Sequence, residues 1–235
     1  MNKFNECVSI ISPCYNGEKY IKEQIDSIIE QLNEEDEFIV SLDPSNDDSE
    51  RIILEYPKIK LVHGPGKGVI KNFENGLKYA QNKFVFLTDQ DDIWLEDKVK
   101  LVLEQFEKDT MVVVHDAIFI DENKNKIQDS YFAGRDFNTS FLKHILKNPY
   151  MGCCMCLRKE VIDKAIPFPN KIPMHDQYLG LVAELLGKTK FYERPLLLYR
   201  RHGQNASNTS HSSVMQMIKW RGQVILAVFK VKFCS

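Results

Sequence analysis

The chain has 235 residues, of which 43% are hydrophobic and 27% charged, and its formal net charge is -2. This length suits one large α/β domain, or one domain with a short appendage, and the composition is that of a globular protein. The near-neutral charge gives no reason to expect nucleic acid as a partner. The six cysteines lack the regular spacing of a disulfide framework or a zinc site, which is typical of reduced, intracellular cysteines.

In the first 110 residues, short apolar runs alternate with segments of helical periodicity, a pattern that predicts βαβ units on a mainly parallel sheet. The expected strands are residues 7–12, 38–42, 60–63 and 84–88. Ligands of such sheets bind beyond the carboxyl ends of the strands. We therefore expect the strand ends at Ser12, Asp43 and Asp89 to converge on one crevice.

The pattern loosens beyond residue 110. A strand at 111–120, a short helix at 141–146 and a strand at 152–156 predict a mixed half that binds a second substrate. Residues 208–235 combine basic and apolar side chains without an acidic one, which predicts a helix that packs on the domain or lies on an anionic membrane. With no signal peptide and no long apolar run, we expect a cytoplasmic protein, peripheral on the inner face of the membrane at most.

The acidic run after the fourth expected strand is the strongest chemical signal. Asp89, Asp91 and Asp92 repel one another unless a cation offsets their charge, and Mg²⁺ or Mn²⁺ takes carboxylates together with substrate phosphates. A plainer interpretation is a solvated turn that caps a helix at 94–108. An apolar strand followed by Asp-x-Asp also opens aspartyl phosphatases, but those carry it on their first strand.

Three segments resemble family 2 glycosyltransferases, which have the GT-A fold. They are IISPCYNG at 10–17, LDPSNDDS at 42–49 and TDQDDIW at 88–94, and the last is similar to the form found in rhamnosyltransferase-like members. The resemblance extends over roughly residues 7–207. It implies an α/β GT-A domain with a Rossmann-like, mainly parallel sheet flanked by helices and a mixed acceptor-side half.

The implied boundaries are a GT-A domain at 1–207, with a nucleotide-sugar half up to about 110 and an acceptor half at 111–207, followed by the basic, apolar helix at 208–235. The resemblance also assigns donor-site roles. It implies that Asp43 contacts the pyrimidine of the nucleotide, Asp89 the ribose side, and Asp91 a Mn²⁺ or Mg²⁺ ion. Further candidates for nucleotide binding are Ser12, Tyr15, Asn16, Lys67 and Asn72.

The acceptor side is implied by two later segments. MHDQY at 174–178 resembles the segment of the catalytic base, which falls on Asp176; a helix cap is the alternative. In the segment 198–207, His202 is a metal ligand, a diphosphate donor or a packed loop residue, and Arg200 or Arg201 neutralises phosphate. The remaining candidates for the diphosphate or acceptor side are Trp94, Gly152 and His175.

Together these features predict an inverting, metal-dependent glycosyltransferase. It moves a sugar from a UDP- or dTDP-linked donor to a hydroxyl of a surface polysaccharide, such as lipopolysaccharide or capsule, or of a lipid-linked glycan. Two rivals remain: an aspartyl phosphatase that acts on a sugar phosphate, and a non-catalytic glycan-binding subunit with the GT-A fold.

Overall fold

The computed structural model describes residues 6–137, 140–203, 205 and 213–233. The strands are β1 (Val8–Cys14), β2 (Glu37–Leu42), β3 (Ile59–His63), β4 (Phe84–Leu87), β5 (Ile93–Trp94), β6 (Thr110–Ile120), β7 (Lys126–Gln128), β8 (Met155–Arg158) and β9 (Lys188–Arg200). The helices are α1 (Ile21–Ile29), α2 (Ser49–Leu54), α3 (Val69–Leu77), α4 (Lys98–Leu103), α5 (Phe141–Leu146), the 3₁₀ turn η1 (Gly152–Cys154), α6 (Lys159–Ala165), α7 (His175–Leu186) and α8 (Val214–Phe233).

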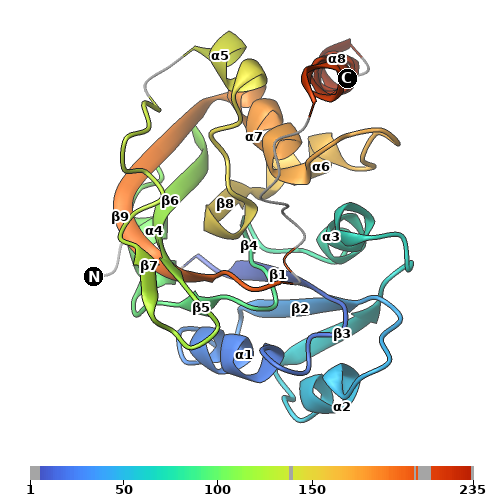
Figure 1. Ribbon diagram of the computed structural model, residues 1–235, viewed down its shortest axis with the longest axis vertical. Helices are drawn as coiled ribbons and strands as arrows, with labels where there is room; N and C mark the ends of the chain where they lie inside the picture. Colours follow the sequence, from blue (N-terminus) through green and yellow to red (C-terminus); the bar gives the residue numbers. More distant parts are fainter. Residues whose placement is uncertain (1–5, 138–139, 204, 206–212, 234–235) are drawn as a thin grey trace.

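One curled sheet runs through the domain in the order β3-β2-β1-β4-β8-β6-β9-β5, and β7 pairs with β6. The strands β1 to β4 are parallel, β8 is antiparallel to both of its neighbours, and β6 is parallel to β9 (Figure 1). This confirms the predicted α/β architecture with a mainly parallel first half and a mixed second half.

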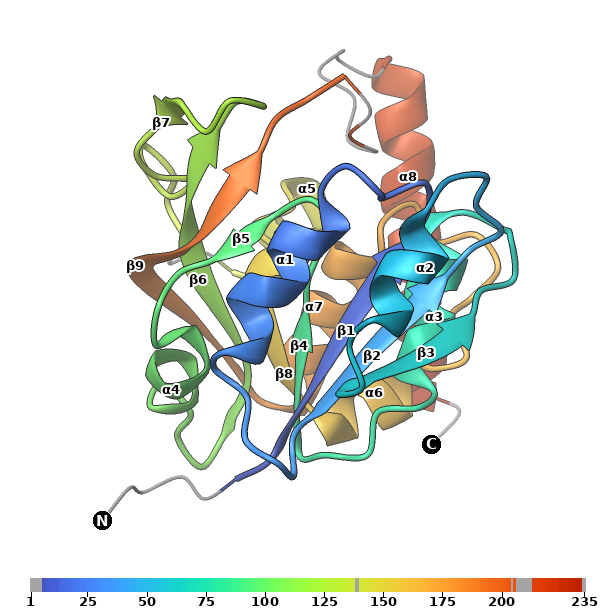
Figure 2. The same cartoon turned by 90° about the horizontal axis from the view of Figure 1, so that it is seen from below.

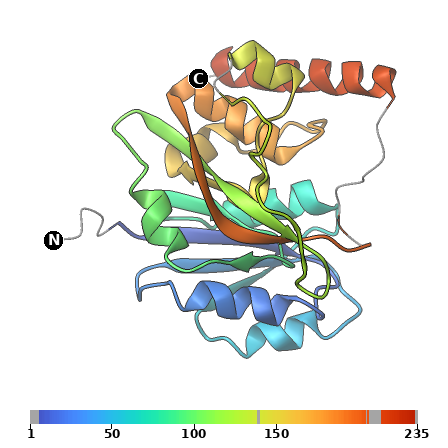
Figure 3. The ribbon, with the colours of Figure 1, turned by 60° about the vertical axis from the view of Figure 1, so that its left-hand side comes forward.

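Helices cover both faces of the sheet. In Figure 2, α1 and α2 lie in front of the parallel strands, with α6 and α7 behind them. The helix α1 buries Ile21, Ile25 and Ile28, which recur at the spacing of one helical face. By contrast, α7 is apolar on nearly all sides, because it packs between the sheet on one side and α5, α6 and α8 on the other (Figure 3).

Three predicted boundaries were wrong. The strand β1 continues to Cys14, because Cys14 still pairs with Leu42 of β2, so Ser12 lies within the strand rather than at its end. Residues 93–94 pair with β9 as β5, and the helix expected at 94–108 begins only at Lys98. The strand expected at 152–156 starts at Met155, after the turn η1.

The long α8 forms within the expected terminal segment, and the boundary expected at 207/208 lies outside the described residues. Across the described part of the chain, no helix combines the length and the apolar character needed to cross a bilayer.

Candidate active site

Three loops at the carboxyl edge of the parallel strands are joined by reciprocal hydrogen bonds. The amide of Tyr15 donates to Gln90 Oε1 (2.8 Å), and Gln90 Nε2 donates back to the Tyr15 carbonyl (3.0 Å). Asn16 has a left-handed backbone conformation (φ 45°). Its Oδ1 accepts a hydrogen bond from the Asn46 amide (2.9 Å), and its own amide donates to Ser45 Oγ (3.0 Å). The loops after β1, β2 and β4 therefore form one connected rim.

Asp43 and Asn72 lie side by side behind this rim, and both are buried. Asp43 Oδ1 accepts the Gly66 amide (2.8 Å), while Asn72 bonds Ser41 Oγ (2.6 Å) and the Cys14 carbonyl (3.1 Å). A Cβ atom at Gly64 would overlap the Oδ1 atoms of both side chains. The absence of a side chain at residue 64 thus allows the carboxylate and the amide to meet.

The acidic run lies in a desolvated position. Burial, followed by the charges of Asp91 and Asp176, raises the pKa of Asp89 to about 7. Burial and the charges of Asp91 and Asp89 raise the pKa of Asp92 well above its usual range. Asp92 Oδ1 accepts the Arg200 amide (3.0 Å), whereas its Oδ2 has no hydrogen-bond partner among the described residues. Three carboxylates are therefore crowded where negative charge is costly.

Two groups of side chains in this region are candidates for a metal ion. In the first, Asp91 Oδ2 lies 2.7 Å from His202 Nε2 and 3.2 Å from Asn205 Nδ2. His202 also stacks on the ring of Tyr20, with centroids 4.8 Å apart. A carboxylate oxygen and an imidazole nitrogen are both ligands that a divalent ion accepts, and here they contact each other directly.

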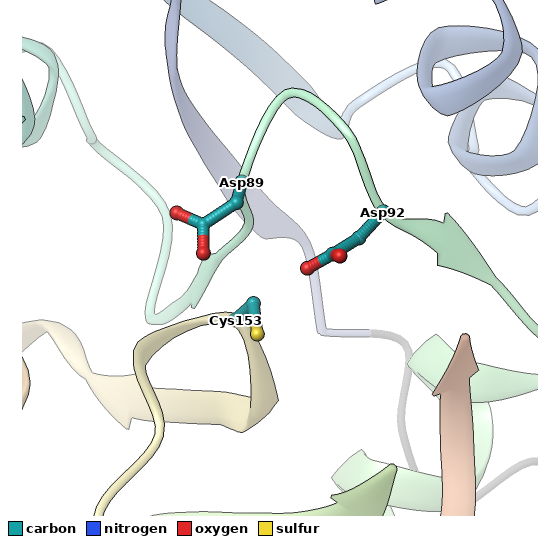
Figure 4. A group of neighbouring side chains, drawn as sticks. All are labelled: Asp89, Asp92 and Cys153. Carbon is teal, nitrogen blue, oxygen red and sulfur yellow. The ribbon is translucent and has the colours of Figure 1, made fainter. Parts of the chain in front are cut away.

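In the second group, the ligand atoms of Asp89, Asp92 and Cys153 lie within 4.8 Å of one another (Figure 4). A thiol is a soft ligand, and burial raises the pKa of Cys153 well above its usual range. For Mg²⁺ or Mn²⁺ the oxygen and nitrogen atoms of the first group therefore fit better, with the carboxylates of Asp89 and Asp92 close by.

Arg200 and Arg201, the two arginines of the segment 198–207, have different surroundings. The Arg200 guanidinium is buried, where it donates to the Asp91 carbonyl (2.9 Å) and to Glu23 Oε2 (2.6 Å). Arg201 is partly exposed and lies against the rings of Phe119 and Tyr199. Arg200 thus holds the acidic loop, and Arg201 is the more accessible of the two.

The first turn of α7 carries Asp176, which lies close to the acidic loop. Burial raises the pKa of Asp176 to about 6, although its Oδ1 accepts the Gln177 amide (2.6 Å) and Asn148 Nδ2 (3.4 Å). The effect of Asp176 on the pKa of Asp89 reflects the proximity of the two carboxyl groups. One carboxylate from the second half of the chain thus comes close to the acidic loop of the parallel half.

His175 lies beside Asp176 in a packed position. Its ring stacks on Phe73 (centroids 4.1 Å apart), and Gly152 approaches so closely that a Cβ atom there would lie 2.9 Å from Nε2. Burial lowers the pKa of His175 to about 4, so the ring is neutral near pH 7. Its Nε2 has no hydrogen-bond partner among the described residues.

Other predicted residues lie further from the rim. Ser12 and Trp94 are buried in an interior network, in which Gln24 Nε2 donates to Ser12 Oγ (3.1 Å) and Trp94 Nε1 to Thr88 Oγ1 (3.0 Å). Lys67 is exposed in the loop between β3 and α3. The network supports the base of the acidic loop, and Lys67 remains accessible beside Asp43.

Sequence reasoning missed Lys98, a fully buried lysine below the acidic loop. Its Nζ donates to the Cys153 carbonyl (3.1 Å) and lies 4.0 Å from the centre of the Trp94 ring, while burial lowers its pKa to about 8. In the sequence, the only indication that Lys98 is buried is its position next to the apolar residues of α4. Gln90, which joins two loops, was also missed, although it lies inside the acidic segment.

The comparisons with known proteins agree with this geometry. The domain described as "Glycosyl transferase family 2" matches residues 9–166. UDP-Glc:alpha-D-GlcNAc-diphosphoundecaprenol beta-1,3-glucosyltransferase WfgD of Escherichia coli is 31% identical over 180 residues, which are 74% of this chain and 68% of WfgD. Glycosyltransferase GlyG of Streptococcus pneumoniae is 29% identical, with 87% of this chain and 74% of GlyG covered.

Among solved structures, Staphylococcus aureus TarS 1-349 in complex with UDP-GlcNAc has a TM-score of 0.70 at 22% identity, covering 94% of this chain and 66% of that one. The mannosyltransferase PcManGT from Pyrobaculum calidifontis, in complex with GDP-Man and Mn²⁺, has a TM-score of 0.62 at 15% identity, covering 100% of this chain and 66% of that one. These likenesses confirm the GT-A fold. With the family match over residues 9–166, they make this chain a member of glycosyl transferase family 2, and it is a glycosyltransferase.

Proposed function

We propose that the protein is an inverting, divalent-metal-dependent transferase that moves a sugar from a UDP- or dTDP-linked donor to a hydroxyl of a surface polysaccharide or a lipid-linked glycan. The observation that carries this proposal is that the acidic loop after β4 lies close to Asp176 of the second half of the chain. Asp43 and the acidic loop come from the parallel half, and Asp176 comes from the first turn of α7.

The donor half has the groups that a nucleotide requires. The carboxylate of Asp43 and the amide of Asn72 offer hydrogen-bond partners to a pyrimidine edge, since their positions are fixed by Gly66 and Ser41. Tyr15 is exposed at the rim, where its ring has room to lie along the base. Asp89 stays the candidate for the ribose side, and Lys67 or Arg201 for the diphosphate.

Asp91 and His202 would hold Mn²⁺ or Mg²⁺, which when bound offsets the charge on the departing nucleoside diphosphate. Arg200 acts on this site indirectly in our proposal. Because its guanidinium is bonded to the Asp91 carbonyl and to Glu23, it positions the loop rather than contacting phosphate.

Asp176 is the proposed catalytic base. It accepts the proton of the acceptor hydroxyl while that oxygen bonds to the anomeric carbon on the face opposite the leaving diphosphate, which inverts the configuration. Burial raises the pKa of Asp176 to about 6, so the carboxylate is charged near pH 7 yet holds a proton better than an exposed one. His175, neutral and stacked on Phe73, positions the turn and does not take the proton.

The expected halves at about 1–110 and 111–207 become, in this proposal, the donor and acceptor sides of one site. A lipid-linked acceptor fits a cytoplasmic enzyme that works at the inner membrane face, with α8 as the contact; WfgD, by its name, acts on a diphosphoundecaprenol-linked sugar. Membership of the rhamnosyltransferase-like branch, and a role in lipopolysaccharide or capsule, belong to the same proposal.

Family membership favours glycosyl transfer over the aspartyl phosphatase. A non-catalytic glycan-binding role is opposed by the presence of all three proposed site carboxylates, Asp43, Asp91 and Asp176. The two rivals still make distinct predictions, since a phosphatase releases phosphate from a sugar phosphate, and a binding subunit turns over no donor.

The test is a screen of UDP-, dTDP- and GDP-sugars for hydrolysis and for thermal stabilisation, with Mn²⁺, with Mg²⁺ and with EDTA. We expect metal-dependent stabilisation and turnover with a UDP- or dTDP-sugar, both lost in Asp91→Asn. Asp97→Asn, in the turn before α4, is the matched control and should behave as the unmodified protein. Turnover that persists in EDTA would contradict the metal dependence, and preference for GDP-sugars would contradict the donor class.

A further inference from the structure

The helix α8 has two apolar faces, only one of which is covered by the residues that the structure describes. Val224, Ala227 and Val228 are buried against the domain. On the other side of the same helix, Met215, Ile218 and Leu226 follow one another at helical spacing and are more than half exposed. An outward apolar stripe of this kind is unfavourable in water and indicates a surface that meets another apolar phase.

The short helix α5 extends this surface. It lies beside α8 at the same end of the molecule in Figures 1 and 3, and Arg221 of α8 donates to the Leu146 carbonyl (2.9 Å). Leu142 and Leu146 are 69% and 58% exposed, which is unusual for two leucines in a six-residue helix. Six apolar side chains of α5, α7 and α8 line a cavity of about 90 Å³ at this junction: Phe141, Ile145, Leu185, Ile225, Val228 and Phe229.

The exposed charged side chains of α5 and α8 themselves are basic, whereas Glu184 of the neighbouring α7 is bonded to His144 of α5. Lys143 on α5, Lys147 directly after it, and Lys219 and Lys230 on α8 are all exposed. No acidic residue occurs at 140–158 or at 194–235. Exposed leucines bordered by lysines are the arrangement by which a helix lies in the headgroup region of an anionic bilayer, with its apolar face toward the acyl chains.

We infer that α5 and α8 together form a docking surface for an anionic lipid bilayer. The inference rests on the lipid-linked acceptor proposed above, and it adds a geometric reason for the surface. Both helices pack against α7, whose first turn carries Asp176. Docking through this surface therefore fixes the orientation of the proposed base relative to a bilayer in which the acceptor lipid is anchored.

The experiment is co-sedimentation of the full chain with vesicles of phosphatidylglycerol and phosphatidylcholine, compared with phosphatidylcholine alone. We expect binding to the anionic vesicles and at least about tenfold weaker binding to the neutral ones. The double variant Ile218→Ser/Leu226→Ser should bind the anionic vesicles at least about tenfold more weakly. Its matched control is Leu54→Ser on the distant α2, where the leucine is 66% exposed against 67% for Leu226.

Charge is tested separately. Lys219→Glu/Lys230→Glu should lose at least about tenfold in anionic vesicle binding, whereas Lys78→Glu/Lys108→Glu, the same charge change at exposed lysines elsewhere, should keep it. Equal loss in both pairs would overturn the inference, since it would show an effect of net charge alone.

A second copy of this chain is the competing occupant. Light scattering without lipid should give a monomer; a dimer that Ile218→Ser/Leu226→Ser dissociates, together with absent vesicle binding, would overturn the inference. Hydrolysis of the nucleotide sugar in lipid-free solution should be unchanged in all these variants. Loss of vesicle binding with intact hydrolysis thus separates failure of the surface from failure of the proposed transferase.

Discussion

The proposed donor and acceptor sides of the site are built in different ways. The donor rim consists of loops that follow β1, β2 and β4 and hold one another through Tyr15, Asn16 and Gln90. The acceptor side has one carboxylate, Asp176, held by its own helix turn and a long bond from Asn148. A rigid rim suits a fixed nucleotide, whereas a desolvated single carboxylate suits proton transfer, so variants on the two sides should fail differently.

The largest expected effect is on the acceptor side. Asp176→Asn should lower kcat/KM for transfer by about 10²- to 10⁴-fold, the range for loss of a general base, while the Kd for UDP changes less than about twofold. Steady-state kinetics and calorimetry measure the two. Asp163→Asn, an exposed acid on α6, is the control. A variant with full transfer activity would remove Asp176 from the mechanism.

Asp176→Asn should also change the thermal stability of the protein. Because burial raises the pKa of Asp176 above its unfolded value, the charged carboxylate costs folding free energy at pH above about 6, and this cost disappears as the pH falls toward 4. Asp176→Asn should therefore have a Tm at pH 8 at least as high as the unmodified protein. A lower Tm at pH 8 would indicate lost packing instead.

A variant on the donor side should change the affinity for the nucleotide. Gly64→Ala adds a Cβ atom that overlaps Asp43 Oδ1 and Asn72 Oδ1, and overpacking typically costs about 1–3 kcal/mol. We expect the Kd for UDP to rise by roughly five- to 150-fold, with a smaller effect on turnover at saturating donor. Gly222→Ala, where a Cβ atom meets nothing within 4 Å, should leave the Kd unchanged.

The pH profile sharpens the difference between the sides. Transfer requires the charged form of Asp176, whose pKa is about 6, so kcat should be level above pH 7 and fall about tenfold per unit well below pH 6. The measurement is kcat at saturating donor from pH 4.5 to 8.5, with binding of the donor followed in parallel. A kcat that is independent of pH over this range would exclude Asp176 as the base.

The smallest effect should come from Asn148. Its amide donates to Asp176 Oδ1 at 3.4 Å and favours the charged carboxylate. Asn148→Ala should move the midpoint of the kcat profile to higher pH by less than about one unit, because a long neutral hydrogen bond is weak. An unmoved midpoint with lowered kcat would assign Asn148 to acceptor binding.

Much of the fold was predictable, because each βα unit carries its apolar period and its strand-end polar residue in one short segment. Strand ends were less predictable. Ser12 closes the apolar run, yet pairing with Leu42 extends β1 to Cys14 and leaves Ser12 inside. Here the backbone ladder, and not the apolar run, decides where a strand stops.

The supports of the site were not predictable, because they join distant segments. Arg200 was expected to meet phosphate, and its burial depends on Glu23, 177 residues away. Lys98 has no local signal for its contact with Cys153, which forms only when β8 docks beside β4. Such contacts depend on tertiary packing, which a single sequence does not state.

The attachment of the acidic loop to Arg200 has a consequence for the order of folding. Its carbonyl at Asp91 and its carboxylate at Asp92 accept hydrogen bonds from Arg200, more than a hundred positions later, so this side of the loop depends on β9, whereas Gln90 is held by Tyr15. These two hydrogen bonds can form only after Arg200 has been synthesised, well after β1 to β4. A chain that ended before β9 would carry the four parallel strands and lack both contacts to the acidic loop.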